Sequence, residues 1–310
     1  MAKIDGPVIV LSGGFSEERE VSLVSAREIA AALGGLGYEI SMFDPADYPS
    51  YADMMVAIRA RKPTFVFNGL HGAEGEDGRL QSLLELAGVP FNGCRYRACA
   101  IAMDKYISAI IAGFLNIRSP DKIIFPAPVR PPAAQLEKIG YPMVIKPNDS
   151  GSSVGITMIK EETELESAIK EAARYSRQIL YEKYIRGKEL TVTILGEEAL
   201  PVVEIRPKQG WYDYRNKYTG GNTDYIIPAE IDNAIADRVK TMAQAIFKFM
   251  GGQVYARVDF RFDGKDIYFL EVNTLPGMTP LSLTPMAARA QGMEFPQLLE
   301  KIMELSLQLR

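Results

Sequence analysis

Two β-strands are predicted by the stretches VYARVDFRF (residues 254–262) and DIYFLEVN (residues 266–273). Both stretches are rich in aromatic and β-branched residues, which favour strands. The three residues between them, Asp263-Gly264-Lys265, supply a glycine for the positive φ that a tight turn requires. We therefore predict a β-hairpin with a three-residue loop.

Polar side chains on this hairpin have the composition of a magnesium site. Side chains alternate faces along a strand, so Arg257 and Asp259 share one face of the first strand. Glu271 and Asn273 likewise share one face of the second. Asp259, Glu271 and Asn273 would supply hard oxygen ligands, with the Arg257 cation close to phosphate charge. On the pattern alone, solvent-facing residues of an amphipathic hairpin remain an equal alternative.

Composition restricts the class of protein. A chain of 310 residues favours two or three domains, and 47% hydrophobic with 24% charged residues is typical of a soluble globular protein. A net charge of −4 without a basic stripe gives no reason to expect nucleic acid. One histidine excludes a histidine-based metal site, and two cysteines suit a reducing compartment. Without a long apolar run or a signal peptide, we expect a cytoplasmic protein that does not bind membranes.

The first part of the chain alternates predicted strands and helices, the pattern of an open parallel sheet that binds ligands at the carboxyl ends of its strands. The strands are expected at residues 7–11, 38–43 and 64–68, and helices at 51–61 and 78–87. Another helix should begin at Ser16 as N-cap, with Glu17 and Glu18 in its first turn. Its predicted apolar stripe is Val21, Val24, Ile29, Leu33 and Leu36.

The pattern then changes, and three domains fit best: residues 1–94, 95–184 and 185–310. The second is expected to open with one long helix over residues 95–115, followed by a small unit of mixed strands and helices. The third contains a loop rich in glycine and tyrosine, a helix over 231–250, the acidic hairpin and a terminal helix.

A phosphate-binding loop is predicted at residues 147–155, which are rich in glycine and serine and follow Lys146 at the end of an apolar strand. Backbone N–H groups of such a loop and a lysine charge suit phosphate, although a flexible hairpin loop is the alternative. Further along, Glu182 and Glu189 could accept from a nucleoside, and the backbone at Lys183 and Ile185 could contact the base. A solvated strand end has the same spacing.

Two candidate substrate groups lie in the first domain. Glu18 could receive a substrate ammonium group, although acids at a helix start also complement the helix dipole. His71 follows a predicted strand at the open end of the parallel sheet, where a ligand role and a packing role are equally plausible. In the third domain, the aromatic segment 211–221 lacks periodicity and indicates a functional lid.

Taken in order, these motifs resemble the ATP-grasp ligases and, within them, the D-alanine–D-alanine ligases. The resemblance covers nearly the whole chain, and departs from the family pattern only around residues 92–97 and 115–124. It rests on eight stretches: 13–23 with GG…SEEREVSL, 70–78 with LHG…GEDG, 103–105 with MDK, 144–155 with VIKP…GSSVG, 182–183 with EK, 212–218 with YDY…KY, 257–259 with RVD, and 270–283 with LEVNT…PGMT…SL.

The resemblance implies a mixed α/β fold with three parts: an N-terminal parallel-sheet domain, a small central lid domain and a C-terminal mixed-sheet domain. It also implies the site residues. The ATP-binding residues would be Lys105, Lys146, Ser152, Ser153, Glu182, Lys183, Ile185 and Glu189. The metal ligands would be Asp259, Glu271 and Asn273, and the catalytic groups Glu18, Ser152, Tyr218, Arg257 and Gly277. The substrate-binding residues would be Glu18, His71, Lys217, Arg257, Ser282 and Leu283.

The implied reaction joins two D-alanine molecules through an acylphosphate formed with ATP, for peptidoglycan precursor synthesis. Two Mg²⁺ ions (or Mn²⁺) would assist, and the protein would be a homodimer. Relatives that form the D-alanyl-D-lactate ester place a histidine in this lid. The lid around Lys217 and Tyr218 contains none, so the resemblance implies an amine as second substrate. The alternatives are a ligase for another amino-acid pair, a dinucleotide-binding oxidoreductase built on the first domain, and a non-catalytic nucleotide-binding regulator.

Overall fold

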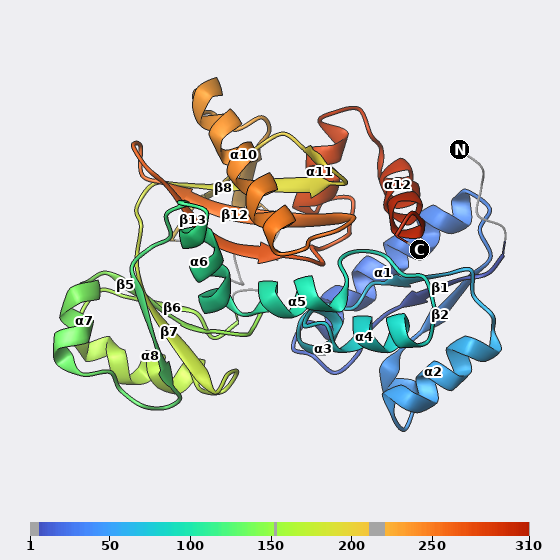
Figure 1. Cartoon of the computed structure of the whole chain (residues 1–310), viewed down its shortest axis with the longest axis horizontal. Helices are drawn as coiled ribbons and strands as arrows, with labels where there is room; N and C mark the ends of the chain where they lie inside the picture. The colour runs from blue at the N-terminus through green and yellow to red at the C-terminus, as the bar shows by residue number, and fades with distance from the viewer. Residues whose placement is uncertain (1–5, 152–153, 211–220, 310) are drawn as a thin grey trace.

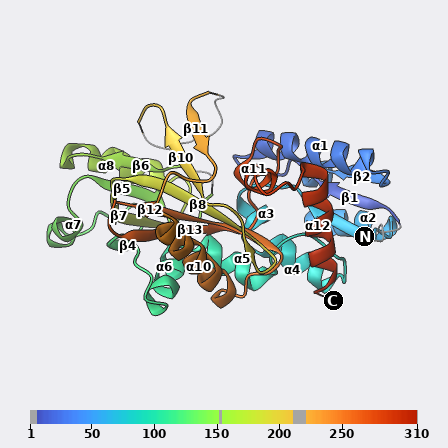
Figure 2. The same cartoon turned by 90° about the horizontal axis from the view of Figure 1, so that it is seen from above.

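The computed structural model describes residues 6–151, 154–210 and 221–309. The strands of these residues form three sheets. Figures 1 and 2 show the sheets in a row along the longest axis of the molecule, with the sheet of the C-terminal part in the middle. Each sheet lies within one of the three predicted domain ranges, while the boundaries themselves stay a prediction.

The N-terminal sheet is parallel, as predicted, with the order β2-β1-β3. Its strands are β1 (Val8–Leu11), β2 (Ile40–Phe43) and β3 (Phe65–Asn68). Both β1 and β3 are buried along their whole length, which is why their sequences are apolar up to Asn68 at the end of β3. The same part of the chain also contains the helices α2 (Tyr51–Ala60), α3 (Ala73–Glu76) and α4 (Arg79–Leu86).

Helix α1 (Arg19–Gly35) begins later than predicted, and its predicted apolar stripe is confirmed at Ile29 and Leu33 but not at Val24 and Leu36. The N-cap is Glu18, not Ser16, whose hydroxyl instead donates to the carbonyl oxygen of His71 at 2.5 Å. Buried positions include Ser22 and Ser25 in place of Val24 and Leu36, which are 47% and 37% exposed. Serines can face the sheet because they find partners there: the Ser22 hydroxyl donates to the Gly69 carbonyl oxygen at 2.8 Å.

The long helix predicted over residues 95–115 is wrong. The chain forms two helices, α5 (Tyr96–Met103) and α6 (Lys105–Phe114), because Asp104 adopts an extended conformation between them. The Asp104 carboxylate accepts from the Ile107 N–H at 2.9 Å, so it caps α6 in place of continuing α5. This break places Lys105 at the first residue of a new helix.

The other two sheets are antiparallel in all their described pairs, so the predicted mixed sheet of the C-terminal part is an antiparallel one. The central sheet has the order β4-β7-β5-β6 and the C-terminal sheet the order β11-β10-β8-β12-β13, with β9 paired to β8. The central strands are β4 (Lys122–Pro126), β5 (Met143–Pro147), β6 (Thr157–Ile159) and β7 (Gln178–Lys183). The C-terminal strands are β8 (Lys188–Leu195), β9 (Glu198–Ala199), β10 (Val203–Pro207), β11 (Thr223–Ile226), β12 (Tyr255–Phe262) and β13 (Ile267–Asn273).

The acidic hairpin is β12 and β13, as predicted, but its loop has four residues, not three. Phe262 pairs with Ile267, and Gly264 has φ of 96°. The Asp263 carboxylate accepts from the N–H groups of Lys265 and Asp266 at 2.8 and 2.7 Å. These bonds hold Asp266 in the turn and lengthen the loop by one residue.

Helices complete the other two parts. Helices α7 (Ala133–Ile139) and α8 (Leu165–Ala172) belong to the central part, and α10 (Asn233–Phe249), α11 (Leu283–Arg289) and α12 (Phe295–Leu307) to the C-terminal part. Short 3₁₀ turns occur at Pro45–Asp47 and Glu162–Glu164. Within the described ranges, no helix is long and apolar enough to span a membrane.

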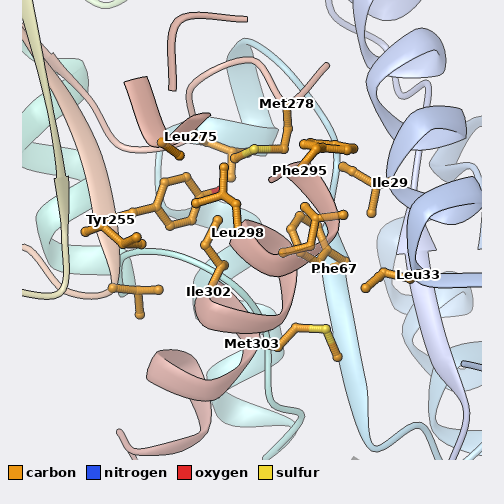
Figure 3. Close-up of a cluster of buried hydrophobic side chains, with 14 of the residues drawn as sticks. Ile29, Leu33, Phe67, Tyr255, Leu275, Met278, Phe295, Leu298, Ile302 and Met303 are labelled. Atoms are coloured by element: carbon orange, nitrogen blue, oxygen red, sulfur yellow. The ribbon is translucent and has the colours of Figure 1, made fainter. Parts of the chain in front are cut away.

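One buried cluster joins the N-terminal and C-terminal parts. Figure 3 shows Ile29 and Leu33 of α1 with Phe67 of β3 on one side, and Leu298 and Ile302 of α12 on the other. These side chains are fully buried, and each contributes roughly 1.5–3 kcal/mol relative to an exposed position. The first domain is therefore held firmly against the sheet that carries the acidic hairpin.

Candidate active site

The register of the acidic hairpin brings its four polar residues together. Arg257 lies opposite Asn273, and Asp259 lies opposite Glu271. An irregularity in the register follows immediately after Asp259, so the strands separate from regular pairing just beyond the polar residues. All four side chains line one pocket.

Arg257 and Asp259 form a bidentate pair within this pocket. Arg257 Nε donates to Asp259 Oδ1 at 2.9 Å and Nη2 donates to Oδ2 at 2.8 Å. The Thr191 hydroxyl also donates to Asp259 Oδ1, at 2.5 Å. Both charged residues are buried, at 6% and 8% exposed. Such a pair fixes the guanidinium and the carboxylate in one orientation before a ligand arrives.

Lys105 joins the pocket from α6 because of the helix break at Asp104. Its Nζ donates to the Ser150 carbonyl oxygen at 2.5 Å and lies 3.4 Å from Glu271 Oε2. The first contact ties the helix to the predicted phosphate loop, and the second places a cation beside the hairpin carboxylate. Ser152 and Ser153 of that loop lie outside the described residues.

A second pocket adjoins the first and contains five of the eight predicted ATP-binding residues. Lys146, Glu182, Lys183, Ile185 and Glu189 all line it. Apolar side chains complete its walls: Pro120, Val144, Ile156 and Leu270, with Tyr184 beside them. Apolar walls, backbone edges and a lysine at one end suit a nucleotide base with phosphates.

The two pockets share Glu189, Asp259 and Glu271. Burial raises the pKa of Glu189 to about 7, with the Arg261 guanidinium, 2.7 Å away, opposing that shift. A molecule in the second pocket can therefore extend directly to the hairpin carboxylates in the first.

Glu182 is a buried carboxylate held between two lysines. Its Oε1 lies 2.8 Å from Lys146 Nζ, and its Oε2 lies 2.6 Å from Lys122 Nζ. Burial alone would raise the pKa of Glu182, but the two ammonium groups outweigh it and lower the pKa to about 2. Lys122 was not among the predicted site residues, because it is one polar residue in a short strand with no motif around it.

We expect the Glu182 carboxylate to make the free energy of unfolding decrease at acid pH. The folded-state pKa of about 2 lies below the ordinary 4.5, so the contribution is complete above about pH 4.5 and is lost as the pH falls toward 2. It amounts to about 3 kcal/mol by the linkage relation. The free energy of urea unfolding should drop between about pH 5 and pH 3 by more in the wild type than in Glu182→Gln. Equal drops would contradict the role of this carboxylate.

The predicted substrate residues of the first domain are buried next to residues that line the first pocket. Glu18 and His71 are 3% and 5% exposed. His71 Nε2 lies 3.0 Å from the Ser25 hydroxyl, and its Nδ1 lies 3.7 Å from Glu76 Oε1. Glu76 lines the pocket, and its Oε1 accepts from the Gly72 N–H at 2.8 Å. Sequence reasoning noted the motif around Glu76 but did not assign the residue.

Gly151 shows how closely the predicted phosphate loop approaches these acids. A Cβ at residue 151 would lie 3.2 Å from Glu18 Oε2 and 3.5 Å from Glu76 Oε2. The loop and the acidic groups of the first domain therefore meet at one edge of the pocket, where a larger side chain would press against them.

Gly277 and Ser282 lie in the segment between β13 and α11, and Leu283 is the first residue of α11. The Ser282 hydroxyl accepts from the Thr279 N–H at 3.1 Å, and a Cβ at residue 277 would lie 3.1 Å from that hydroxyl. None of these three predicted residues lines either pocket in the ranges that the structure describes. The predicted lid residues Lys217 and Tyr218 lie outside those ranges.

The donor set fits a magnesium ion that also binds phosphate. Among the described residues, no group of three His, Cys, Asp or Glu is arranged to hold a metal. The hairpin offers two carboxylates and the Asn273 amide, whose Oδ1 already accepts from the Leu275 N–H at 3.0 Å. Mg²⁺ is commonly held by one or two carboxylates with substrate phosphates and water. The site is therefore suitable for a metal–nucleotide complex.

Comparison with known proteins gives a consistent result. Residues 124–304 match the family model described as D-ala D-ala ligase C-terminus, and residues 49–94 match D-ala D-ala ligase N-terminus. The chain is 40% identical over 303 residues to a D-alanine–D-alanine ligase of Dechloromonas aromatica, which covers 97% of this chain and 98% of the relative.

Two solved structures extend the comparison. The D-alanine–D-alanine ligase of Bacillus anthracis complexed with ATP superposes with a TM-score of 0.86 at 34% identity, covering 99% of this chain and 98% of the other. The VanG D-Ala:D-Ser ligase of Enterococcus faecalis superposes with a TM-score of 0.80 at 29% identity, covering 98% and 100%.

Proposed function

Because the chain belongs to the D-alanine–D-alanine ligase family, it is an ATP-dependent ligase that joins two D-alanine molecules, and we propose that its two adjoining pockets are the active site. One observation carries this assignment: Glu189, Asp259 and Glu271 line both pockets. ATP in the second pocket would bring its terminal phosphate to the first, where the substrate carboxylate must react. The product supplies peptidoglycan precursor synthesis.

ATP would lie with its base against Lys183 and Ile185, near the Glu182 carboxylate. Glu189 would accept from the ribose hydroxyls. Lys105 and Lys146 would contact the phosphates, together with the loop that contains Ser152 and Ser153. These roles are supported by the shared lining of the pockets and by the contact of Lys105 with the loop backbone at Ser150.

Asp259, Glu271 and Asn273 would hold two Mg²⁺ ions, which Mn²⁺ could replace. When bound, the ions neutralise phosphate charge and keep the reacting oxygens in line. Asp259 lies opposite Glu271 in the hairpin and both line the two pockets, while Asn273 lines the first pocket beside them.

The substrate roles follow from charge and position. Glu18, with His71 beside it, would hold the ammonium group of the first D-alanine. Arg257 and the Gly277 N–H would face the oxyanion, where fixed donors lower the barrier most.

The second D-alanine would bind its carboxylate at Ser282, the Leu283 backbone and Lys217. Tyr218, Ser152 and Glu18 would link the lid, the phosphate loop and the first domain. Such a closed arrangement protects an acylphosphate from water.

We also propose that the protein is a cytoplasmic homodimer. Ile107, Ile110 and Phe114 are exposed apolar residues on one face of α6. The ring centroids of Phe114 and the exposed Phe249 of α10 lie 5.3 Å apart. This apolar face is the strongest candidate for the subunit contact. Two buried free thiols, Cys94 and Cys99, suit a reducing compartment.

The acceptor preference tests this function. In ATP-dependent phosphate release with D-alanine as donor, we expect D-alanine to be preferred over D-serine as acceptor by about tenfold or more, because a pocket fitted to a methyl group disfavours an added hydroxyl. D-Lactate should support still less turnover. A preference for D-serine would replace this function with that of a D-Ala:D-Ser ligase.

A further inference from the structure

Lys122 has a place in the central sheet that the proposed roles leave unexplained. It lies on β4 directly opposite Glu182 of β7. On its other side Glu182 lies opposite Val144 of β5, so Lys146 is its diagonal neighbour two residues further along. The register of three strands therefore places one carboxylate between two lysines.

Alternation along the strands directs this cluster toward the nucleotide pocket. Ile123 and Phe125 of β4 pack with the buried core on one face of the sheet. Lys122 then belongs to the opposite face, with Glu182 and Lys146, and these two line the nucleotide pocket. Lys122 itself does not line that pocket within the described ranges. It contacts the Glu182 carboxylate, which does line the pocket.

The contact between Lys122 and Glu182 is a buried ion pair. The two side chains are 6% and 4% exposed, with 2.6 Å between Nζ and Oε2. At this separation the opposite charges of the ammonium group and the carboxylate attract each other strongly. An uncompensated carboxylate at this depth would be very unfavourable.

The cluster carries one more positive charge than negative. If Lys122 were absent, Glu182 would have only Lys146 as counter-ion, and that pair would be neutral. The phosphates of a nucleotide would then compete with Glu182 for a single ammonium group. With Lys122 present, Glu182 keeps a counter-ion of its own, and Lys146 has charge available for phosphate.

We propose that Lys122 is a positioning residue for ATP: it holds the Glu182 carboxylate at the base end of the nucleotide pocket and leaves the Lys146 charge to the phosphates. This inference rests on the proposed nucleotide site. Lys122 would affect the affinity for ATP and the choice of nucleotide base without contacting the nucleotide itself.

Lys122→Met tests the proposal through a split between kinetic parameters. The KM for ATP should rise about ten- to a hundredfold, the scale of a lost interaction with a charged group. The kcat at saturating ATP and the KM for D-alanine should change less than about threefold, since Lys122 is not among the described residues that line the first pocket. Lys122→Arg should restore the KM for ATP to within about threefold, because it keeps the charge.

Base choice provides a readout that a merely structural role would not change. ITP has a carbonyl oxygen where ATP has the 6-amino group, so a fixed Glu182 acceptor discriminates between them. The preference for ATP over ITP should fall in Lys122→Met. Lys170→Met is the matched control, because Lys170 is an exposed lysine on α8 of the same part. It should leave all these parameters unchanged.

A double-mutant comparison tests whether Lys122 affects ATP binding through Glu182. In a Glu182→Gln background, adding Lys122→Met should change the KM for ATP by less than about threefold, because the two residues act as a unit. If Lys122→Met alone does not fold, Lys122→Gln with Glu182→Gln removes both charges and allows the same comparison against Glu182→Gln. A further tenfold rise there, or an unchanged KM for ATP in folded Lys122→Met, would overturn the proposal. Absence of ATP-dependent ligation in the wild type would instead refute the proposed function.

Discussion

Glu271→Gln is expected to abolish turnover, lowering kcat by about 10³-fold or more. Glu271 lies opposite Asp259, lines both pockets and approaches Lys105. The substitution keeps the shape of the side chain and removes its charge. Metal-assisted stabilisation of phosphate charge is worth several kcal/mol, and each 1.36 kcal/mol is tenfold in rate.

Two measurements separate this effect from misfolding. Mn²⁺ binding in the presence of ADP should weaken in Glu271→Gln, while the thermal unfolding temperature without ligands should stay close to that of the wild type. Glu198→Gln is the matched control, since Glu198 is an exposed residue of β9 in the same sheet. Turnover near the wild-type rate in Glu271→Gln would refute the metal assignment.

Arg257→Lys is expected to lower kcat by about 10²- to 10³-fold, with a much smaller change in the KM for ATP. The guanidinium is fixed by two parallel bonds to Asp259. A fixed donor aimed at a developing oxyanion contributes on this scale. Lysine keeps the positive charge but cannot reproduce the planar fork. Lysine is chosen over an apolar residue because Asp259 would otherwise lose its buried counter-ion.

Arg118→Lys is the control for this substitution. Arg118 pairs with Asp266 at 2.8 Å, and its side chain is 65% exposed. Exposed ion pairs contribute little, so steady-state kinetics should be unchanged. If Arg257→Lys affected the KM for ATP and left kcat intact, Arg257 would be a nucleotide-binding residue and its place at the oxyanion would be wrong.

The sequence predicted best where one local rule decides the structure. Alternation along two strands was enough to group Arg257, Asp259, Glu271 and Asn273, because a hairpin pairs neighbours in the chain. Apolar runs, which in β3 end at Asn68, were enough to predict β1 and β3, since both faces of a parallel sheet are covered.

Predictions from the sequence were wrong or incomplete where residues far apart in the chain determine the local structure. Ser22 and Ser25 are buried in α1 because groups at residues 69 and 71 satisfy their hydroxyls. Asp104 ends one helix and caps the next, although the apolar pattern continues through it. Lys122 contacts Glu182 from a neighbouring strand, and Glu76 lines the first pocket from the N-terminal part; spacing along the chain encodes neither position.

Oxygen transfer from substrate to phosphate is the most direct test of the central claim. D-Alanine labelled with oxygen-18 in both carboxylate oxygens would be incubated with ATP, Mg²⁺ and the protein. Attack of the carboxylate on the terminal phosphate, followed by displacement by an amine, leaves one substrate oxygen on the released phosphate. We predict D-alanyl-D-alanine, ADP and phosphate in equal amounts, with one labelled oxygen in each phosphate. Dipeptide formed with unlabelled phosphate, or ATP hydrolysis without dipeptide, would contradict an acylphosphate ligase.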